Sequence, residues 1–162
     1  ELDEKLRQFL VHCFPETAHI FSKQRFYHEP PQFRWCIFDE NGSLIAHVAL
    51  HIKKVKTEFA SYDMGGIAEV CVHTDFRQQG ITRMLLKQIL DYLRERGFAF
   101  AMLFGDLKIY SSSGFKPMEN KFRFFDQKSQ EWRIGNDPSA MYLELGQANW
   151  PDGIIDICGP TF

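Results

Sequence analysis

The sequence predicts an α/β fold built on a mixed sheet, and three patterns in its 162 residues support this. From Gly66 to Gly97 a short β-rich apolar run, a polar turn and an amphipathic helix follow one another. Asn41-Gly42 separates two apolar runs, which is the strongest short-range signal of a β-hairpin. Phe98 to Phe104 is apolar on both faces, as expected of an interior strand covered by helices.

The N-terminal segments are expected to be helical. Leu2 to Phe14 has its apolar residues on one face and stops before a proline, which predicts an amphipathic surface helix. A second short helix is expected over Glu16 to Ser22. Lys23 to Gln32 contains two prolines and is expected to be a loop. Its Arg25, Phe26, Tyr27 and His28 either line a pocket or belong to a solvated connection.

The hairpin strands are expected at Phe33 to Phe38 and Leu44 to Val55. Alternation places His47 and His51 on the same face of the second strand, about 13 Å apart along the chain. That separation is too large for one metal ion, so we expect half-exposed sheet histidines and no metal site. A third strand begins after Thr57, and Gly65-Gly66 predicts a bulge or a bend in it.

The remaining elements follow the helix that starts at Ile81. Asp106 caps a short helix over Leu107 to Ser113, which Gly114 closes. Late strands are expected at Phe122 to Phe125 and Met141 to Leu145, around a polar loop from Gln127 to Ser139. The tail from Trp150 to Phe162 is expected to be irregular. Residues 1–162 are expected to form one domain.

Bulk composition disfavours several classes of function. The formal net charge of -2 leaves no basic field for nucleic acid. No apolar run approaches the roughly 20 residues that span a bilayer, and no signal-peptide pattern is present, so we expect a cytoplasmic protein without membrane contact. Four cysteines without a Cys-x-x-Cys pair are expected to be free, buried thiols in a reducing compartment. The chain begins at Glu1 rather than Met, which leaves open what precedes it.

A candidate anion site lies where the central helix begins. Arg77-Gln78-Gln79-Gly80-Ile81-Thr82 places free backbone N–H groups at a helix N-terminus, with a glycine that lets a ligand approach the backbone. Such a site suits a diphosphate. The glycines of a dinucleotide fold and the Gly-Lys-Ser/Thr of a P-loop are absent, so nucleotide hydrolysis has little support.

Two motifs resemble the Gcn5-related N-acetyltransferase (GNAT) superfamily over Phe33 to Phe115. Its acyl-CoA loop, Arg/Gln-x-x-Gly-x-Gly/Ala after a Val-x-Val strand, is matched from Val70 to Thr82, although Thr82 replaces the usual Gly or Ala. Its Tyr-x-x-x-Gly-Phe helix is matched by Tyr110, Gly114 and Phe115. The resemblance implies a mixed, mostly antiparallel central sheet flanked by helices, with acetyl-CoA as co-substrate and no metal. The residues implied in binding it are Val70, Cys71, Val72, Arg77, Gln78, Gln79, Gly80, Ile81 and Thr82.

The resemblance also suggests an acceptor. Residues 44–49 and 65–77 resemble aminoglycoside 2'-N-acetyltransferases, and residues 149–160 resemble nodulation N-acyltransferases; both act on an amine of an amino sugar. We therefore expect acetyl transfer to a primary amine of a small molecule, such as an amino sugar or aminoglycoside. The alternatives are a longer acyl-CoA or an acyl carrier protein as donor, or a non-catalytic acyl-CoA-binding domain. The oligomeric state, a homodimer included, stays open.

Two residues are the candidate catalytic groups. Glu69 is the carboxylate best placed to accept the proton of the amine, and the alternative is a surface strand glutamate. Tyr110, which the resemblance places near the thioester sulfur, would protonate the leaving thiolate; the alternative is a structural tyrosine. Cys71 lacks an evident activating base in the sequence, so a direct transfer between positioned substrates is favoured over a covalent intermediate.

Overall fold

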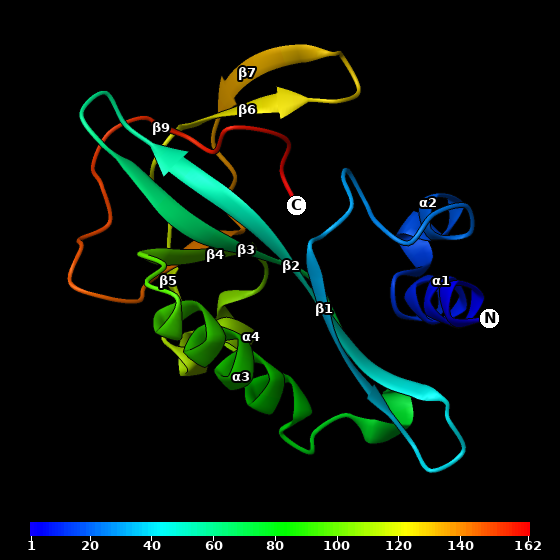
Figure 1. The fold of residues 1–162 in the computed structure, drawn as a ribbon. Coiled ribbons are helices and arrows are strands. Elements are labelled where there is room, and N and C mark those ends of the chain that lie inside the picture. The colour runs from blue at the N-terminus through cyan, green and yellow to red at the C-terminus, as the bar shows by residue number, and fades with distance from the viewer.

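A curved mixed sheet with helices on both faces makes up the computed structural model, which describes residues 1–162 (Figure 1). The helices are α1 (Leu2–Cys13), α2 (Ala18–Phe21), α3 (Ile81–Glu95) and α4 (Leu107–Tyr110), with short 3₁₀ turns at Pro15–Thr17, Thr74–Phe76 and Ser111–Ser113. The strands are β1 (Phe33–Phe38), β2 (Leu44–Lys56), β3 (Ser61–Val72), β4 (Phe100–Phe104), β5 (Lys116–Pro117), β6 (Phe122–Asp126), β7 (Glu131–Gly135), β8 (Ala140–Glu144) and β9 (Ile155–Asp156). None of the helices is long and apolar enough to cross a bilayer.

The sheet confirms the predicted mixed, mostly antiparallel architecture. Its strand order is β5-β8-β4-β3-β2-β9-β6-β7, and β1 pairs with β2. Only β3 with β4 and β6 with β9 run parallel. The parallel connection needs a crossover, and α3 supplies it between β3 and β4. The predicted hairpin is present as β1 and β2.

Helices cover the sheet on opposite sides (Figure 1). The apolar stripe of α3 packs against Leu50, Ile67 and Leu103 of the sheet through Leu85, Leu86, Ile89, Leu90 and Leu93. Burying each such side chain contributes roughly 1.5–3 kcal/mol. On the other face α1 packs on Leu44 and Cys71 through Leu6, Phe9 and Leu10. The sheet is thereby fixed between the two helical layers.

The expected bulge or bend at Gly65-Gly66 is wrong. Both glycines pair regularly, Gly65 with Ile52 and Gly66 with His51. A Cβ at Gly65 would lie 2.5 Å from Leu93 of α3, and one at Gly66 would lie 2.9 Å from the Phe162 ring. The glycines are thus explained by close packing on the two faces of β3, without any irregularity of the strand.

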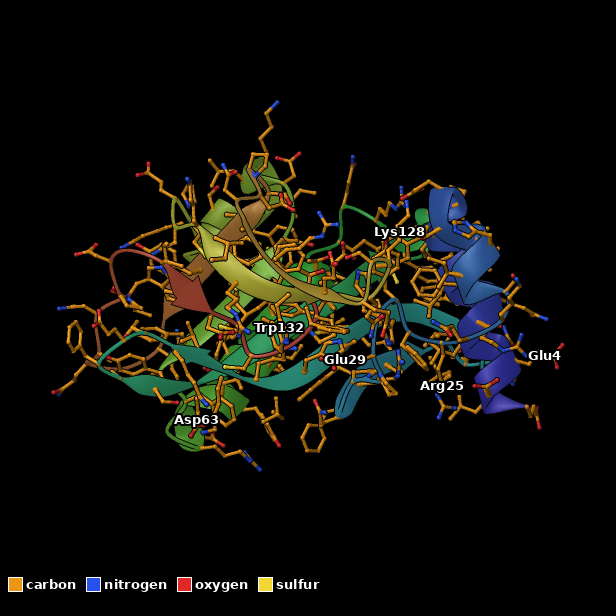
Figure 2. The ribbon with its side chains drawn as sticks, turned by 90° about the horizontal axis from the view of Figure 1, so that it is seen from above. Glu4, Arg25, Glu29, Asp63, Lys128 and Trp132 are labelled. Carbon is orange, nitrogen blue, oxygen red and sulfur yellow. The ribbon has the colours of Figure 1, made fainter.

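The region after Asp126 contains more strand than the sequence predicted. β7 lies inside the expected polar loop and pairs with β6 over Phe122–Asp126. Its Trp132 lies under the Arg123 guanidinium, 3.9 Å from the ring centroid. Trp132, at the centre of the view from above (Figure 2), belongs to this hairpin. The expected irregular tail also contributes a short strand, β9, whose Asp156 pairs with Lys56.

Buried polar side chains occupy the face of β2 opposite α3, which corrects the expectation of half-exposed histidines. His47 is 0% exposed and His51 is 3% exposed. Lys53 is buried on the same face, with its Nζ 2.7 Å from Glu29 Oε1. The physical reason is that the loop after α2 and the C-terminal segment cover this face, and alternation along β2 alone cannot reveal them.

His47 is held in one neutral tautomer. Its Nδ1 lies 2.9 Å from the Glu69 carbonyl oxygen, which only accepts, so Nδ1 carries the proton. Its Nε2 then accepts from Arg34 Nη1 at 2.8 Å. Burial lowers the pKa of His47 to about 4; the hydrogen bond to the Glu69 carbonyl opposes the shift and the charge of Arg34 adds to it. His47 therefore stays neutral when folded.

The buried histidines predict a pH-dependent stability. Unfolding returns each imidazole to a pKa near 6.5, so the unfolded chain binds more protons and the free energy of unfolding falls as the pH drops from about 6.5 to about 4. His47 alone accounts for a loss on the order of 3 kcal/mol. Urea titrations at several pH values in this range give the free energy of unfolding, which should change less with pH in His47→Gln than in wild type. His19→Gln, at an exposed position, is the control. An unchanged pH dependence in His47→Gln would contradict the assignment.

Candidate active site

The predicted anion site is a cleft at the N-terminus of α3. Gly80 is the N-cap with φ +75°, and no side chain caps the helix. Its first N–H groups therefore lack the partners that a helix interior would give them. A Cβ at Gly80 would meet nothing within 4 Å, so the glycine is explained by its left-handed backbone and by the open space above it. Gln78 also has a positive φ, +61°.

The cleft has a volume of about 230 Å³ and is lined by most of the predicted cofactor-binding residues. Val72, Arg77, Gln78, Gly80, Ile81 and Thr82 line it, together with Ile109, Ser112 and Ser113 from the α4 region. Val70, Cys71 and Gln79 lie outside this lining. The segments that carry the two matched motifs, distant in sequence, thus both contribute residues to one cleft.

Two arginines make the cleft positive. Arg77 donates from Nε to the Val72 carbonyl oxygen at 3.2 Å, which holds its side chain against the end of β3. Arg83 also lines the cleft and extends into an adjoining groove. In that groove Lys87 and Arg94 both pair with Asp91 on the helix surface. Arg83 was not among the predicted residues, although its position in the first turn of the helix can be seen in the sequence.

A β-bulge at Glu69 is the main irregularity of β3. Between the pairs Ala49 with Ala68 and His47 with Cys71, β3 has one residue more than β2. Glu69 has φ +51°, which a non-glycine residue adopts at a cost of about 1–3 kcal/mol. The bulge turns Glu69 to the face that Ala68 already occupies.

β3 has a free edge beyond the bulge. Its parallel pairing with β4 ends at Ile67 and Leu103, while β3 continues to Val72. The His73 N–H donates to the Ile45 carbonyl oxygen, on the side of β3 where β2 lies. Backbone groups alternate between the two edges of a strand, so the N–H and carbonyl groups of Val72 and Val70 point to the opposite edge. The bond from Arg77 to the Val72 carbonyl is made at that edge. The free edge runs from the cleft to Glu69.

The Glu69 carboxylate is buried but hydrogen-bonded. Its side chain is 6% exposed; Oε1 accepts from the Tyr27 N–H at 3.1 Å and Oε2 from Arg34 Nη1 at 3.2 Å. Burial raises the pKa of Glu69, and the Arg34 charge and the Tyr27 N–H oppose that rise. Each carboxylate oxygen keeps a free lone pair. The alternative of a surface strand glutamate is therefore wrong, and Arg34 and Tyr27 are partners that the sequence did not reveal.

Tyr110 is a buried tyrosine beside the cleft. Its ring packs against Gly105, where a Cβ would lie 2.4 Å from it, and against Phe115. Burial raises the pKa of Tyr110 to about 12, with smaller contributions from Cys71 and Asp106. The phenol therefore keeps its proton at neutral pH and can donate it. The cleft wall itself is made by its neighbour Ile109 rather than by Tyr110.

Cys71 is not an activated nucleophile. All four cysteines are free, as predicted, but only Cys71 is buried, against α1; Cys13 and Cys36 are half-buried and Cys158 is exposed, so the expectation of buried thiols is wrong for these three. Burial raises the pKa of the Cys71 thiol well above its usual range, with Cys13 adding to the shift. A protonated thiol is a weak nucleophile. No three side chains of His, Cys, Asp or Glu are grouped to hold a metal ion.

Comparison with known proteins agrees with this geometry. The family model for the acetyltransferase (GNAT) domain matches residues 4–118. The uncharacterized N-acetyltransferase YhbS of Escherichia coli strain K12 is 35% identical over 78 residues, which are 48% of this chain and 46% of that protein. The match thus spans about half the length of these curated relatives.

Solved structures share the fold over nearly the whole chain. The E. coli YhbS structure in complex with CoA has a TM-score of 0.63 at 23% identity, covering 96% of this chain and 82% of that one. A GNAT family acetyltransferase from Brucella melitensis in complex with acetyl-CoA has a TM-score of 0.63 at 20% identity, covering 94% and 87%. Because the family model matches most of the sequence, from residue 4 to 118, this chain belongs to the GNAT acetyltransferase family.

Proposed function

We propose that this protein transfers an acetyl group from acetyl-CoA directly to a primary amine of a small molecule. One observation carries the proposal: the free edge of β3 leads from the uncapped N-terminus of α3 to Glu69. The YhbS and B. melitensis structures, which contain CoA and acetyl-CoA, support the choice of donor. Residues 1–162 act as one domain in this proposal.

The pyrophosphate of acetyl-CoA would lie on the N–H groups at the start of α3. Backbone N–H groups and the helix dipole favour negative charge there, and Arg77 and Arg83 add positive charge at the cleft. The amide-bearing arm would follow the free edge of β3, where the N–H groups of Val70 and Val72 can pair with it as a strand pairs with a sheet. The acetyl group then arrives beside Glu69.

The chemistry requires a proton to leave the amine before it attacks the thioester. Glu69 accepts that proton, directly or through a water, because its buried carboxylate has a raised pKa and free lone pairs. Tyr110 protonates the departing thiolate. Most of the rate gain comes from holding the two substrates together, so no acetylated enzyme intermediate is needed.

An amino sugar or aminoglycoside is the acceptor suggested by resemblance in residues 44–49, 65–77 and 149–160. A longer acyl-CoA or a carrier-protein donor would use the same cleft with a different acyl group. A non-catalytic acyl-CoA-binding domain would keep the cleft but would not need a buried carboxylate farther along β3. The burial of Glu69, the retained Tyr110 and the intact Arg77 to Ile81 loop favour the enzyme.

Gly80→Asp tests the position of the pyrophosphate. The substitution puts negative charge and bulk where the phosphates are expected, so the Kd for CoA measured by calorimetry should rise at least about tenfold. Gly97→Asp is a matched control, because Gly97 has φ +74° and open space around it at the other end of α3. Equal CoA affinity in both variants would contradict the placement.

Glu69→Gln tests the base. Glutamine keeps one oxygen as an acceptor for either Arg34 or the Tyr27 N–H and is a far weaker base, so kcat/KM near neutral pH should fall roughly 10²-fold. The deficit should shrink as the pH approaches the acceptor's own pKa, where the amine is already neutral. The measurement is a pH–rate profile against wild type, and an equal deficit at every pH would assign Glu69 a structural role.

Tyr110→Phe tests the acid. Phenylalanine retains the ring that packs on Gly105 and Phe115 but has no proton to donate, so turnover should fall roughly 10²-fold with little change in CoA affinity. Steady-state kinetics and calorimetry on the same variant separate the two effects. Full turnover would mean that the thiolate leaves unassisted and that Tyr110 is structural.

A further inference from the structure

A second cavity lies on the face of β3 that Glu69 occupies, and it has the size of one small apolar group. It measures about 180 Å³, and four of its eight lining residues are aromatic: Phe14, Phe21, Tyr27 and Phe162. Cavities of about 150 Å³ hold a benzene ring, whereas pockets for drug-sized ligands begin at about 300 Å³. An aromatic ring or short alkyl chain fits this space.

Carboxylates are the charged groups that line the cavity. Glu69 is at its β3 wall and Glu16 at its helical wall, and the cavity lining contains no lysine or arginine. The nearest cation to Glu69 is Arg34, which already pairs with it. A protonated amine is the ligand head group that such a site attracts.

Contacts within the chain hold the Phe162 ring and the Tyr27 backbone at the cavity wall. The Phe162 ring rests on Gly66, where a Cβ would lie 2.9 Å away, and contacts Phe104 with ring centroids 5.3 Å apart. Tyr27 is tied to Glu69 through its backbone N–H. A preformed apolar site binds without the cost of ordering its side chains.

The cavity and the cleft lie on different faces of β3, at the two ends of the stretch from Ala68 to Val72. Ala68 and Glu69 line the cavity, while Val72 lines the cleft and Ile67 packs under α3. The free edge of β3 joins them where β4 ends. An amine in the cavity would therefore lie beside Glu69, at the point that the acetyl group would reach from the other side.

We propose that the acceptor is a primary amine carried on a small aromatic or apolar body, with the ring in the Phe14–Phe21–Phe162 cavity and the amine at Glu69. This inference rests on the proposed acetyltransferase function and narrows its substrate class. An amino sugar fits less well, because its hydroxyl groups would lose water against aromatic walls that give few hydrogen bonds in return.

The test compares acceptors with acetyl-CoA as donor. We expect kcat/KM for 2-phenylethylamine to exceed that for glucosamine, kanamycin and spermidine by at least about tenfold, the discrimination that one small apolar group gives in a pocket. Calorimetry without acetyl-CoA, where no turnover can occur, should show that 2-phenylethylamine binds. Preference for any of the polar amines, or acetyl-CoA binding without transfer to any amine, would overturn the inference. Absence of both CoA binding and transfer would overturn the proposed function as well.

Two variants place the acceptor. Ala68→Leu fills the cavity and Phe162→Ala removes one wall, so each should raise KM for 2-phenylethylamine about tenfold while the Kd for CoA stays at the wild-type value. The retained CoA affinity shows that each variant is folded. Ala60→Leu, in the β2–β3 turn, is the control with unchanged KM. An unchanged KM in both cavity variants would contradict the placement and leave the acetyl transfer untouched.

Discussion

The position of Glu69 in the candidate site depends on one extra residue in β3. At Glu69 the strand adopts φ +51°, and four groups stabilise this backbone: the His47 ring and the Cys71 thiol at the carbonyl, and Arg34 and the Tyr27 N–H at the carboxylate. These bonds offset the conformational cost. The bulge lies where β4 ends, so it coincides with the free edge of β3 and presents Glu69 to the side opposite α3.

The cleft at α3 and the carboxylate at the bulge differ in how they bind charge. The cleft relies on backbone N–H groups and two arginines, which favour an anion whatever its identity. Glu69 lies in a buried, aromatic setting where a carboxylate is costly and its pKa is raised. The first environment suits tight binding of a diphosphate and the second suits proton transfer from an amine.

Local sequence rules predicted the parts of the fold that depend on local geometry. Helix periodicity predicted α3, Asn41-Gly42 predicted the β1–β2 hairpin, and Gly80 indicated the position of the cleft. The failures have a common cause in tertiary packing. His51 is buried because Glu29 of the loop after α2 and Phe162 of the C-terminal segment lie against it, and Gly66 is explained by Phe162, 96 positions away in the chain. Glu69 was found as a carboxylate in the right strand, but its bulge and its partner Arg34 come from a register shift that alternation does not predict.

The most direct test of the account is a crystal structure of this chain with acetyl-CoA bound. The account predicts pyrophosphate oxygens within hydrogen-bond distance of the N–H groups from Gln78 to Thr82, and the amide-bearing arm along Val70 and Val72. It also predicts the thioester carbon between Glu69 and Tyr110. A pyrophosphate bound away from the α3 N-terminus, or an acetyl group remote from the bulge, would contradict it.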